Sequence, residues 1–321
     1  MPHSTNVDVY SMKTLMARFA EAGLDANALR TEALLRKDEW KSLDSAIIDI
    51  ARPRLVGIKD LQEAGLVRDL GGLGVLVDEW QDQSDMEEAN VSMSGVTEGE
   101  NDSVEFNTQG VPIPIIDRSF YVNIRRLLAS RRNNTPIDTV QAEVAARKVS
   151  DKLEEILFNG VTVKADGYSV YGYTTFPYNV DVTIAGSWST TSTNIISDVE
   201  LMLAAADTNK FWGPFVLYVP TAFWSTLRSD YSSYKNGTFL DRILDYAEIN
   251  KVQHASTLAT NNILLVQLTR DVVDLAVGQD IKNVEWTTLG GMVQHNKVLA
   301  AMAPRLKKTA DGTSGIFHGS P

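Results

Sequence analysis

Apolar residues between positions 135 and 160 recur with the period of an α-helix and predict the longest element of the chain. Their spacings of three, four and five residues place them along one stripe at about 3.6 residues per turn. The stretch opens on Thr-Pro, which suits an N-cap and a first turn, and closes on Asn-Gly, which suits a left-handed stop. We expect a helix whose Val149 and Leu153 face the body of the subunit. The stripe consists of Ile137, Val140, Val144, Val149, Leu153, Ile156 and Leu157.

The beginning of the chain predicts three short helices and then turns. Residues 1–36 hold two short amphipathic patterns, which are marginal as isolated helices. We therefore expect an arm that docks on another subunit or folds back on its own body. Residues 37–52 predict a third helix, which Pro53 ends. The glycine-rich stretch 54–77 predicts short strands and tight turns.

Acidic residues gather between positions 78 and 105, where the chain has no Lys or Arg. The acids are Asp78, Glu79, Asp82, Asp85, Glu87, Glu88, Glu98, Glu100, Asp102 and Glu105. Such a run is most often a solvated surface. Here it leads into alternating apolar residues, among which Pro112 and Pro114 each remove a ladder donor. The combination predicts a long β-ribbon that projects from a core and reaches across a neighbouring subunit.

A basic cluster follows this ribbon. Phe120, Val122 and Ile124 alternate as in a strand. The arginines that follow are Arg125, Arg126, Arg131 and Arg132. We expect this cluster to complement the acidic ribbon of the same chain or of a neighbouring one. The rest of the chain predicts a mixture of helices and strands. We expect a loop or hairpin over 161–190, a helix from about 193, a strand over 215–219, a helix over 223–231 and a capped helix from 238. Further strands are expected over 263–268 and 272–277, followed by a hairpin with strands over 284–287 and 292–302.

Composition and charge narrow the function classes. The formal net charge of −11 argues against a sequence-independent nucleic-acid binder, and the absence of cysteine excludes disulfides and thiolate chemistry. No apolar run is long enough to span a membrane, and no signal peptide pattern opens the chain. The four histidines have no ligand spacing, so no metal, cofactor or catalytic residue is expected. The acid pairs Glu87-Glu88 and Glu154-Glu155 leave a carboxylate-dependent hydrolase as a distant alternative to a structural, non-enzymatic protein.

Three stretches in order resemble the coat proteins of the Hong Kong 97-type fold, which tailed-phage major capsid proteins and bacterial encapsulins share. These stretches are AARKVSDKLEEILFNG at 145–160, GPFVLYVP at 213–220 and GQDI at 278–281, and the resemblance, which covers roughly 35–305, is greatest to the encapsulin (linocin) branch. The resemblance implies an α+β fold. Its expected segments are an N-terminal arm at 1–36, the start of a peripheral domain at 37–77 and an extended loop at 78–118. The peripheral domain continues at 119–212 with its spine helix at 135–160, an axial domain follows at 213–281, and the chain returns to the peripheral domain with a C-terminal tail at 282–321.

The resemblance also implies a function. We expect a phage major capsid protein that forms an icosahedral shell of pentamers and hexamers around double-stranded DNA, without sequence-specific DNA contacts. Separate scaffolding, decoration and portal proteins are further expected partners, and the location is the virion, assembled in the host bacterial cytoplasm. The alternative is an encapsulin shell around an enzyme cargo. The longer arm and the lack of an evident cargo-binding signature favour the phage capsid.

Contacts between subunits are expected from the charged ribbon and its complements. The candidates are Glu87, Glu88, Glu98, Glu100, Asp102, Glu105, Phe106, Arg125, Arg126, Arg131, Arg132, Lys148 and Lys152. Some phages of this fold weld their shells by an isopeptide bond from a lysine in the extended loop. Between Lys59 and Lys148 this chain has no lysine, so we expect a shell without that bond.

Overall fold

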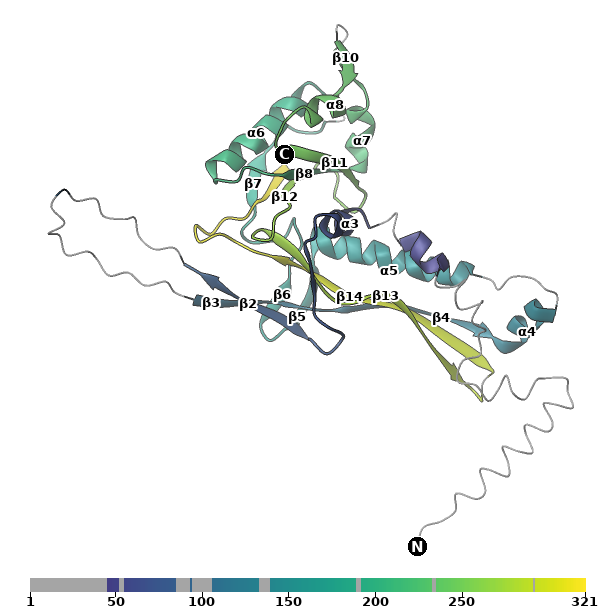
Figure 1. Cartoon of the computed structure of the whole chain (residues 1–321). Coiled ribbons are helices and arrows are strands. Elements are labelled where there is room, and N and C mark those ends of the chain that lie inside the picture. Colours follow the sequence, from purple (N-terminus) through teal and green to yellow (C-terminus); the bar gives the residue numbers. More distant parts are fainter. Residues whose placement is uncertain are drawn as a thin grey trace, which may run out of the picture. The chain divides into compact units, whose positions relative to one another are not determined.

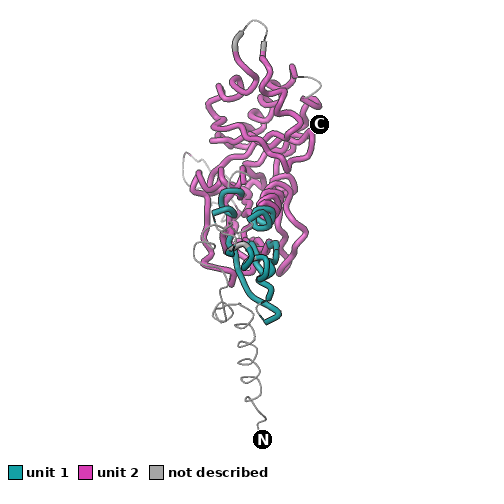
Figure 2. Tube along the Cα trace, turned by 90° about the vertical axis from the view of Figure 1, so that its right-hand side faces the viewer, with its two compact units in different colours: residues 1–50, 117–146, 282–299 teal, residues 51–116, 147–281, 300–321 magenta. Residues whose placement is uncertain are grey.

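The computed structural model describes residues 45–51, 55–84, 93, 106–132, 139–188, 192–232, 235–290 and 292–321 (Figure 1). The expected arm at 1–36 lies outside these residues. Of the helix expected at 37–52, residues 45–51 are helical and bury Ile47. By contacts the chain divides into two units, residues 1–50, 117–146 and 282–299 in one and residues 51–116, 147–281 and 300–321 in the other (Figure 2). The six-segment domain division stays a prediction.

Two larger sheets organise the described strands. The four-stranded sheet has the order β1 (Val67–Asp69), β13 (Val273–Thr288), β14 (Val293–Leu306) and β4 (Ile115–Asn123). The five-stranded sheet has the order β11 (Ile249–Ala255), β8 (Phe215–Pro220), β12 (Ile263–Gln267), β15 (Ile316–Ser320) and β7 (Val180–Thr183). Three two-stranded sheets join β2 (Val77–Gln83) to β3 (Phe106–Pro112), β5 (Val161–Ala165) to β6 (Tyr168–Val170), and β9 (Asp230–Ser232) to β10 (Lys235–Thr238).

The expected long helix is α5 (Val140–Asn159), and its C-terminal half packs as predicted. Val149 and Leu153 are buried, and Gly160 ends the helix with a φ of 73°. The prediction that Val140 and Val144 belong to the buried stripe is wrong, because these side chains are 59% and 40% exposed. A step of five residues turns a helix by about 140° beyond one revolution, so Val144 cannot share a face with Val149. The buried positions in that part of the helix are Ala142, Ala145 and Ala146.

The short strands expected over 54–77 are partly wrong. Residues Val56–Glu63 form a helix, α3, and the stretch contains the strand β1 and, at Val77, the first residue of β2. The sequence pattern suggested a turn at Gly57, but the residue lies inside the helix. A Cβ there would come within 2.6 Å of Leu157 Cδ2, so glycine permits the close approach of α3 to α5. Gly71 and Gly72, with φ values of 76° and 133°, do make the expected turn after β1.

Most of the later elements agree with their predictions. The expected helices are α6 (Ile195–Thr208), α7 (Thr221–Leu227) and α8 (Phe239–Leu244), with a 3₁₀ turn at Ser192–Asn194. Helix α4 (Ile124–Arg132) was not predicted, and it begins at Ile124, which the alternating pattern places in a strand. A capping box between Thr238 and Asp241 starts α8, as expected. Two predictions are wrong. Helix α7 stops at Leu227, and Tyr231 belongs to β9. The strands expected separately over 272–277 and 284–287 are one continuous strand, β13.

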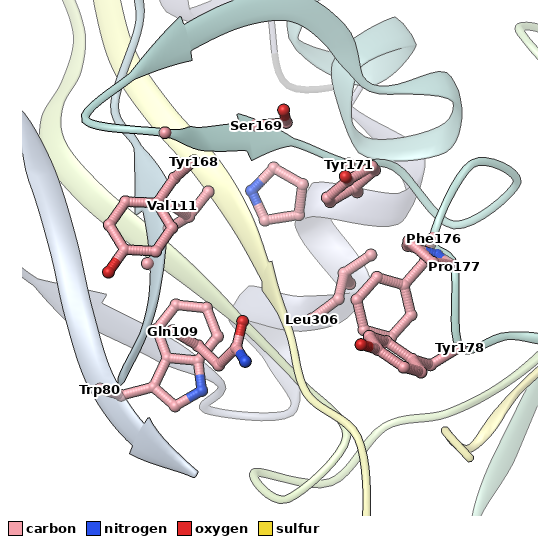
Figure 3. A pocket seen from close by; sticks show the side chains of 13 residues that line it. Trp80, Gln109, Val111, Tyr168, Ser169, Tyr171, Phe176, Pro177, Tyr178 and Leu306 are labelled. Carbon is pink, nitrogen blue, oxygen red and sulfur yellow. The ribbon is translucent and has the colours of Figure 1, made fainter. Parts of the chain in front are cut away.

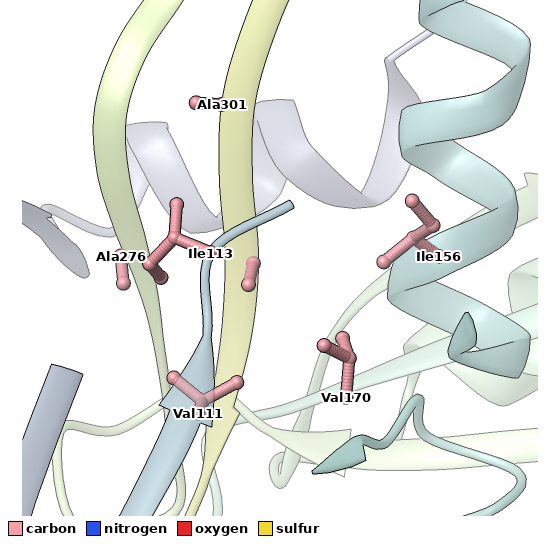
Figure 4. Packing of buried hydrophobic residues seen from close by; sticks show 7 residues of the cluster. Val111, Ile113, Ile156, Val170, Ala276 and Ala301 are labelled. Atoms are coloured by element: carbon pink, nitrogen blue, oxygen red, sulfur yellow. The ribbon is translucent and has the colours of Figure 1, made fainter. Parts of the chain in front are cut away.

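A small apolar core in the second unit joins the ribbon to the end of α5. Val111 and Ile113 come from β3 and the residues after it, and Ile156 comes from α5 (Figure 4). The other buried members are Val170, Ala276, Ala301 and Ala303. The alanines of β13 and β14 leave room for the branched side chains of the ribbon. The base of the ribbon is thus part of the folded core.

Candidate functional site

The antiparallel pair β2–β3 forms the part of the expected ribbon that the structure describes. Its register runs from Val77 opposite Pro112 to Gln83 opposite Phe106. Pro112 therefore ends the ladder, where its missing N–H costs least. We call the end at Asp78 and Val111 the ribbon root. From there the two strands lead towards residues 85–105, most of which lie outside the described part of the chain.

A buried group of charges holds the ribbon root. Arg305 on β14 donates from Nη1 to Asp78 Oδ2 at 3.0 Å and from Nε to Asp274 Oδ1 at 2.6 Å. The side chains of Arg305, Asp78 and Asp274 are each at most 7% exposed. Arg68 Nη2 lies 3.3 Å from Asp78 Oδ1, and Lys307 Nζ lies 2.9 Å from Asp274 Oδ2. Each buried carboxylate thus has two cationic partners, which offset its loss of hydration.

The protonation states follow from these contacts. Burial raises the pKa of Asp274, but hydrogen bonds from Arg305 and Lys307 outweigh it and hold the pKa below its usual value. Burial lowers the pKa of Arg305, and the carboxylates of Asp274 and Asp78 raise it above its usual value. Asp274 and Arg305 are therefore both ionised at neutral pH, and their ion pair carries full charges.

These partners correct the expectation for the first acids of the ribbon. Asp78 is 6% exposed and pairs with Arg305 and Arg68, so it is not a solvated residue. Asp82 lies 3.6 Å from Lys308. The sequence did not predict the pairs with Arg305 and Lys308, because these partners lie more than 200 residues from the acids. The available signal was an arginine in the apolar run before Leu306, since a charge inside a buried strand requires a partner.

An aromatic pocket of about 210 Å³ adjoins the ribbon root. Figure 3 shows Trp80 and Gln109 on one side of it, and Phe176 with Pro177 and Tyr178 on the other. The Tyr168 ring covers Gly110, where an added Cβ would lie 2.8 Å from the ring. Arg305 stacks over Trp80 with its guanidinium carbon 5.3 Å from the ring centre. Aromatic packing therefore supports both strands of the ribbon beside the charge cluster.

The residues predicted to make contacts between subunits lie in different parts of the structure, and some lie outside its described part. Glu87, Glu88, Glu98, Glu100, Asp102 and Glu105 lie outside the described residues. Phe106 is 64% exposed at the far end of β3. The arginines Arg125, Arg126 and Arg132 are exposed on α4, and Arg131 belongs to the same helix. Lys148 is exposed, and Lys152 Nζ pairs with Glu155 at 3.0 Å on α5. Their part in subunit contacts stays a prediction.

The acid pair in α5 serves two surroundings, as its helical spacing predicts. Glu154 is 3% exposed and accepts the backbone N–H of Gly57 at 2.6 Å, whereas Glu155 pairs with Lys152 on the surface. Burial raises the pKa of Glu154 to about 7. Within the described residues, no group of His, Cys, Asp and Glu could hold a metal ion, and no helix is long and apolar enough to cross a membrane.

Two known proteins match the chain over most of its length. The Type 1 encapsulin shell protein EncA of Myxococcus xanthus is 26% identical over 276 residues, which cover 85% of this chain and 90% of EncA. A diheme-cytochrome-encapsulin shell fusion protein of Kuenenia stuttgartiensis is 26% identical over 260 residues, which cover 80% of this chain and 67% of that protein.

Solved structures agree in fold. The virus-like particle from Pyrococcus furiosus superposes with a TM-score of 0.62 at 18% identity, covering 87% of this chain and 98% of that chain. The capsid of Myoviridae phage XM1 superposes with a TM-score of 0.63 at 10% identity, covering 80% and 90%. The α+β Hong Kong 97-type fold and the similarity to the encapsulin branch are thereby confirmed. A family model described as "Family of unknown function (DUF6260)" matches residues 27–319, and the chain belongs to that family.

Proposed function

We propose that this chain is a coat protein that associates with copies of itself into a closed icosahedral shell. The observation that carries the proposal is the ribbon β2–β3, which is firmly rooted yet pairs with no third strand among the described residues. A two-stranded ribbon has little stability by itself in water, and Phe106 offers an exposed aromatic ring at its far end. A neighbouring subunit supplies the surface that such a ribbon needs. The relatives named as shell proteins support the same role.

The finer proposal concerns the contents of the shell. We retain a phage major capsid protein that encloses double-stranded DNA within a virion assembled in the host bacterial cytoplasm. Its subunits would form pentamers and hexamers, with separate scaffolding, decoration and portal proteins as partners. The second candidate is an encapsulin shell around an enzyme cargo, which the names of the two matching proteins favour. The role is structural in both cases, because contacts between the exposed surfaces of identical subunits build the shell.

Size-exclusion chromatography and electron microscopy of the purified full chain test the shell. Large hollow particles are expected, and a stable monomer or dimer under every assembly condition would overturn the proposal. A Phe106→Glu variant should keep the circular dichroism spectrum of the parent subunit, since Phe106 is exposed, but should form few particles. Particles from the native source then decide the contents: nuclease-protected double-stranded DNA and a tail identify a phage capsid, whereas an enclosed enzyme without DNA identifies an encapsulin.

A further inference from the structure

A basic pocket opens beside the ribbon root in the second unit. The pocket has a volume of about 190 Å³, and its charged lining consists of Arg68, Arg270, Arg305, Lys307 and a single carboxylate, Asp274. Four cationic side chains around one small cavity repel each other unless anions balance them. Asp274 and the nearby Asp78 balance only part of this charge. The pocket therefore attracts a further anion.

The hydrogen bonds show which cations are available to that anion. Arg305 is committed to Asp78 and Asp274, and Lys307 to Asp274 and the carbonyl of Arg270. Arg68 makes one ion pair, with Asp78, and its side chain is 50% exposed. Arg270 is exposed, and among the described residues no carboxylate forms an ion pair with its guanidinium. A guanidinium carries five N–H donors, so Arg68 and Arg270 can together bind a carboxylate at the pocket.

The chain itself contains a stretch of matching charge. Residues 85–105 hold seven acids and no Lys or Arg, and they connect β2 to β3. Within one chain, the described strands β2 and β3 extend from the ribbon root beside the pocket to Gln83 and Phe106. The five steps along β2 from Asp78 to Gln83 span roughly 17 Å at about 3.3 Å per residue. The acids of a second copy are not subject to this distance, because their own ribbon starts from another subunit.

We propose that the basic pocket binds a carboxylate side chain from the extended loop of a neighbouring copy of this chain. This inference rests on the proposed shell and names one of the contacts that would hold it together. The pocket contacts Asp78 of its own ribbon root through Arg305 and Arg68. In each subunit, one cluster of cations would therefore hold the subunit's own ribbon root and bind the extended loop of a neighbour. The direction of the ribbon and the contact between subunits would then depend on the same side chains.

Charge reversal tests the contact from both sides. The pocket variant is Arg270→Glu, because this side chain is exposed and its loss breaks no ion pair in the described residues. The loop variants are Glu87→Lys with Glu88→Lys, and separately Glu98→Lys with Glu100→Lys. The matched control is Lys164→Glu, which makes the same change of charge at an exposed lysine elsewhere in the second unit. Circular dichroism of each unassembled variant checks that the subunit folds.

Each reversed variant should assemble at least about tenfold more slowly than the parent at low salt, because like charges then meet at the contact. The Lys164→Glu control should assemble as the parent does. An equimolar mixture of Arg270→Glu with at least one loop variant should recover most of the parent rate. In the mixture the acidic loop of one variant meets the intact pocket of the other, and the basic loop meets the reversed pocket.

Other outcomes would overturn the inference. If Arg270→Glu assembles as fast as its control, or if no mixture recovers, the loop of a neighbour does not use this pocket. A gel shift with double-stranded DNA distinguishes a phosphate ligand: DNA binding by the parent that Arg270→Glu abolishes, without recovery in the mixtures, would assign the pocket to DNA instead. Failure of the parent itself to form particles would contradict the proposed function rather than this contact alone.

Discussion

The carboxylate of Glu154 accepts the backbone N–H of Gly57 at 2.6 Å, and so the spine helix caps the start of helix α3. A second buried acid, Asp60, lies on α3 and accepts hydrogen bonds from Tyr218 at 3.1 Å and Lys251 at 3.3 Å. Burial raises the pKa of Glu154 to about 7, the backbone N–H groups of α3 oppose this shift, and the charge of Asp60 adds to it. The joint between the two helices thus contains an acid that titrates near neutral pH.

This acid predicts how the stability of the subunit changes with pH. Between the usual pKa of 4.5 and the folded value of about 7, the folded state keeps a proton that the unfolded state has lost. The free energy of unfolding should therefore fall as pH rises through this window, by about 3 kcal/mol in all. Urea unfolding of unassembled subunits between about pH 5 and pH 8 measures the fall, which Glu154→Gln should remove. The surface variant Glu155→Gln should keep it, and parallel profiles for all three proteins would refute the assignment.

The packed face of the spine helix predicts a large difference between two truncations. Leu153 is 2% exposed and Val144 is 40% exposed. Leu153→Ala should lower the free energy of unfolding of the subunit by about 2–5 kcal/mol, because it leaves a cavity. Val144→Ala should change it by less than about 0.5 kcal/mol, as expected for a surface site. Denaturant unfolding of both variants measures the contrast, and equal losses would mean that the buried face is misassigned.

The charge cluster at the ribbon root predicts another large loss of stability. Removing Arg305 leaves Asp78 and Asp274 buried with only one cation each. Arg305→Ala should therefore lower the free energy of unfolding by about 3–5 kcal/mol. The exposed pair Lys210–Asp311 supplies the control, and Lys210→Ala should cost no more than about 1 kcal/mol. A small loss for Arg305→Ala would show that water replaces the guanidinium at little cost.

The features that could be predicted from the sequence are those that local patterns determine. The spine helix, the capping box at Thr238 and the alternating strands of the ribbon depend on residues close together in the chain, and the structure contains them. Helix α3 was missed because Gly57 suggested a turn, whereas its role is to admit Leu157. The packed start of α5 was missed because its small alanines give a weak apolar signal beside Val140 and Val144.

In the candidate site, too, local features can be predicted from the sequence and long-range contacts cannot. The acidic character of the ribbon follows from the sequence, but the buried partners of Asp78 do not. The bond from Arg305 to Asp78 joins residues 227 apart, and it exists only because β14 passes the ribbon root. Long-range charge pairs of this kind depend on topology, which local patterns leave open. A resemblance to a known fold supplies the topology but not the identity of the pairs.

The covalent state of the shell can be predicted from residue types alone. The extended loop has no lysine to form an isopeptide bond, and the chain has no cysteine to form a disulfide. Assembled particles boiled in denaturing detergent should therefore run as a single band near the chain mass of 35.4 kDa. A ladder of multimers that survives boiling would refute this expectation.

The contribution of charge to assembly gives the last prediction. The seven acids of residues 85–105 need cationic surroundings, yet exposed ion pairs contribute only about 0–1 kcal/mol each. Salt screens such pairs beyond roughly 8–10 Å near physiological ionic strength. Apolar packing must then supply most of the cohesion, while charge guides the loop to its place. High salt should slow assembly, followed by light scattering, much more than it dissolves finished shells. A loop variant with its acids changed to Gln and Asn should lose this salt dependence, and equal salt dependence in the variant and the parent would exclude a guiding role for the loop.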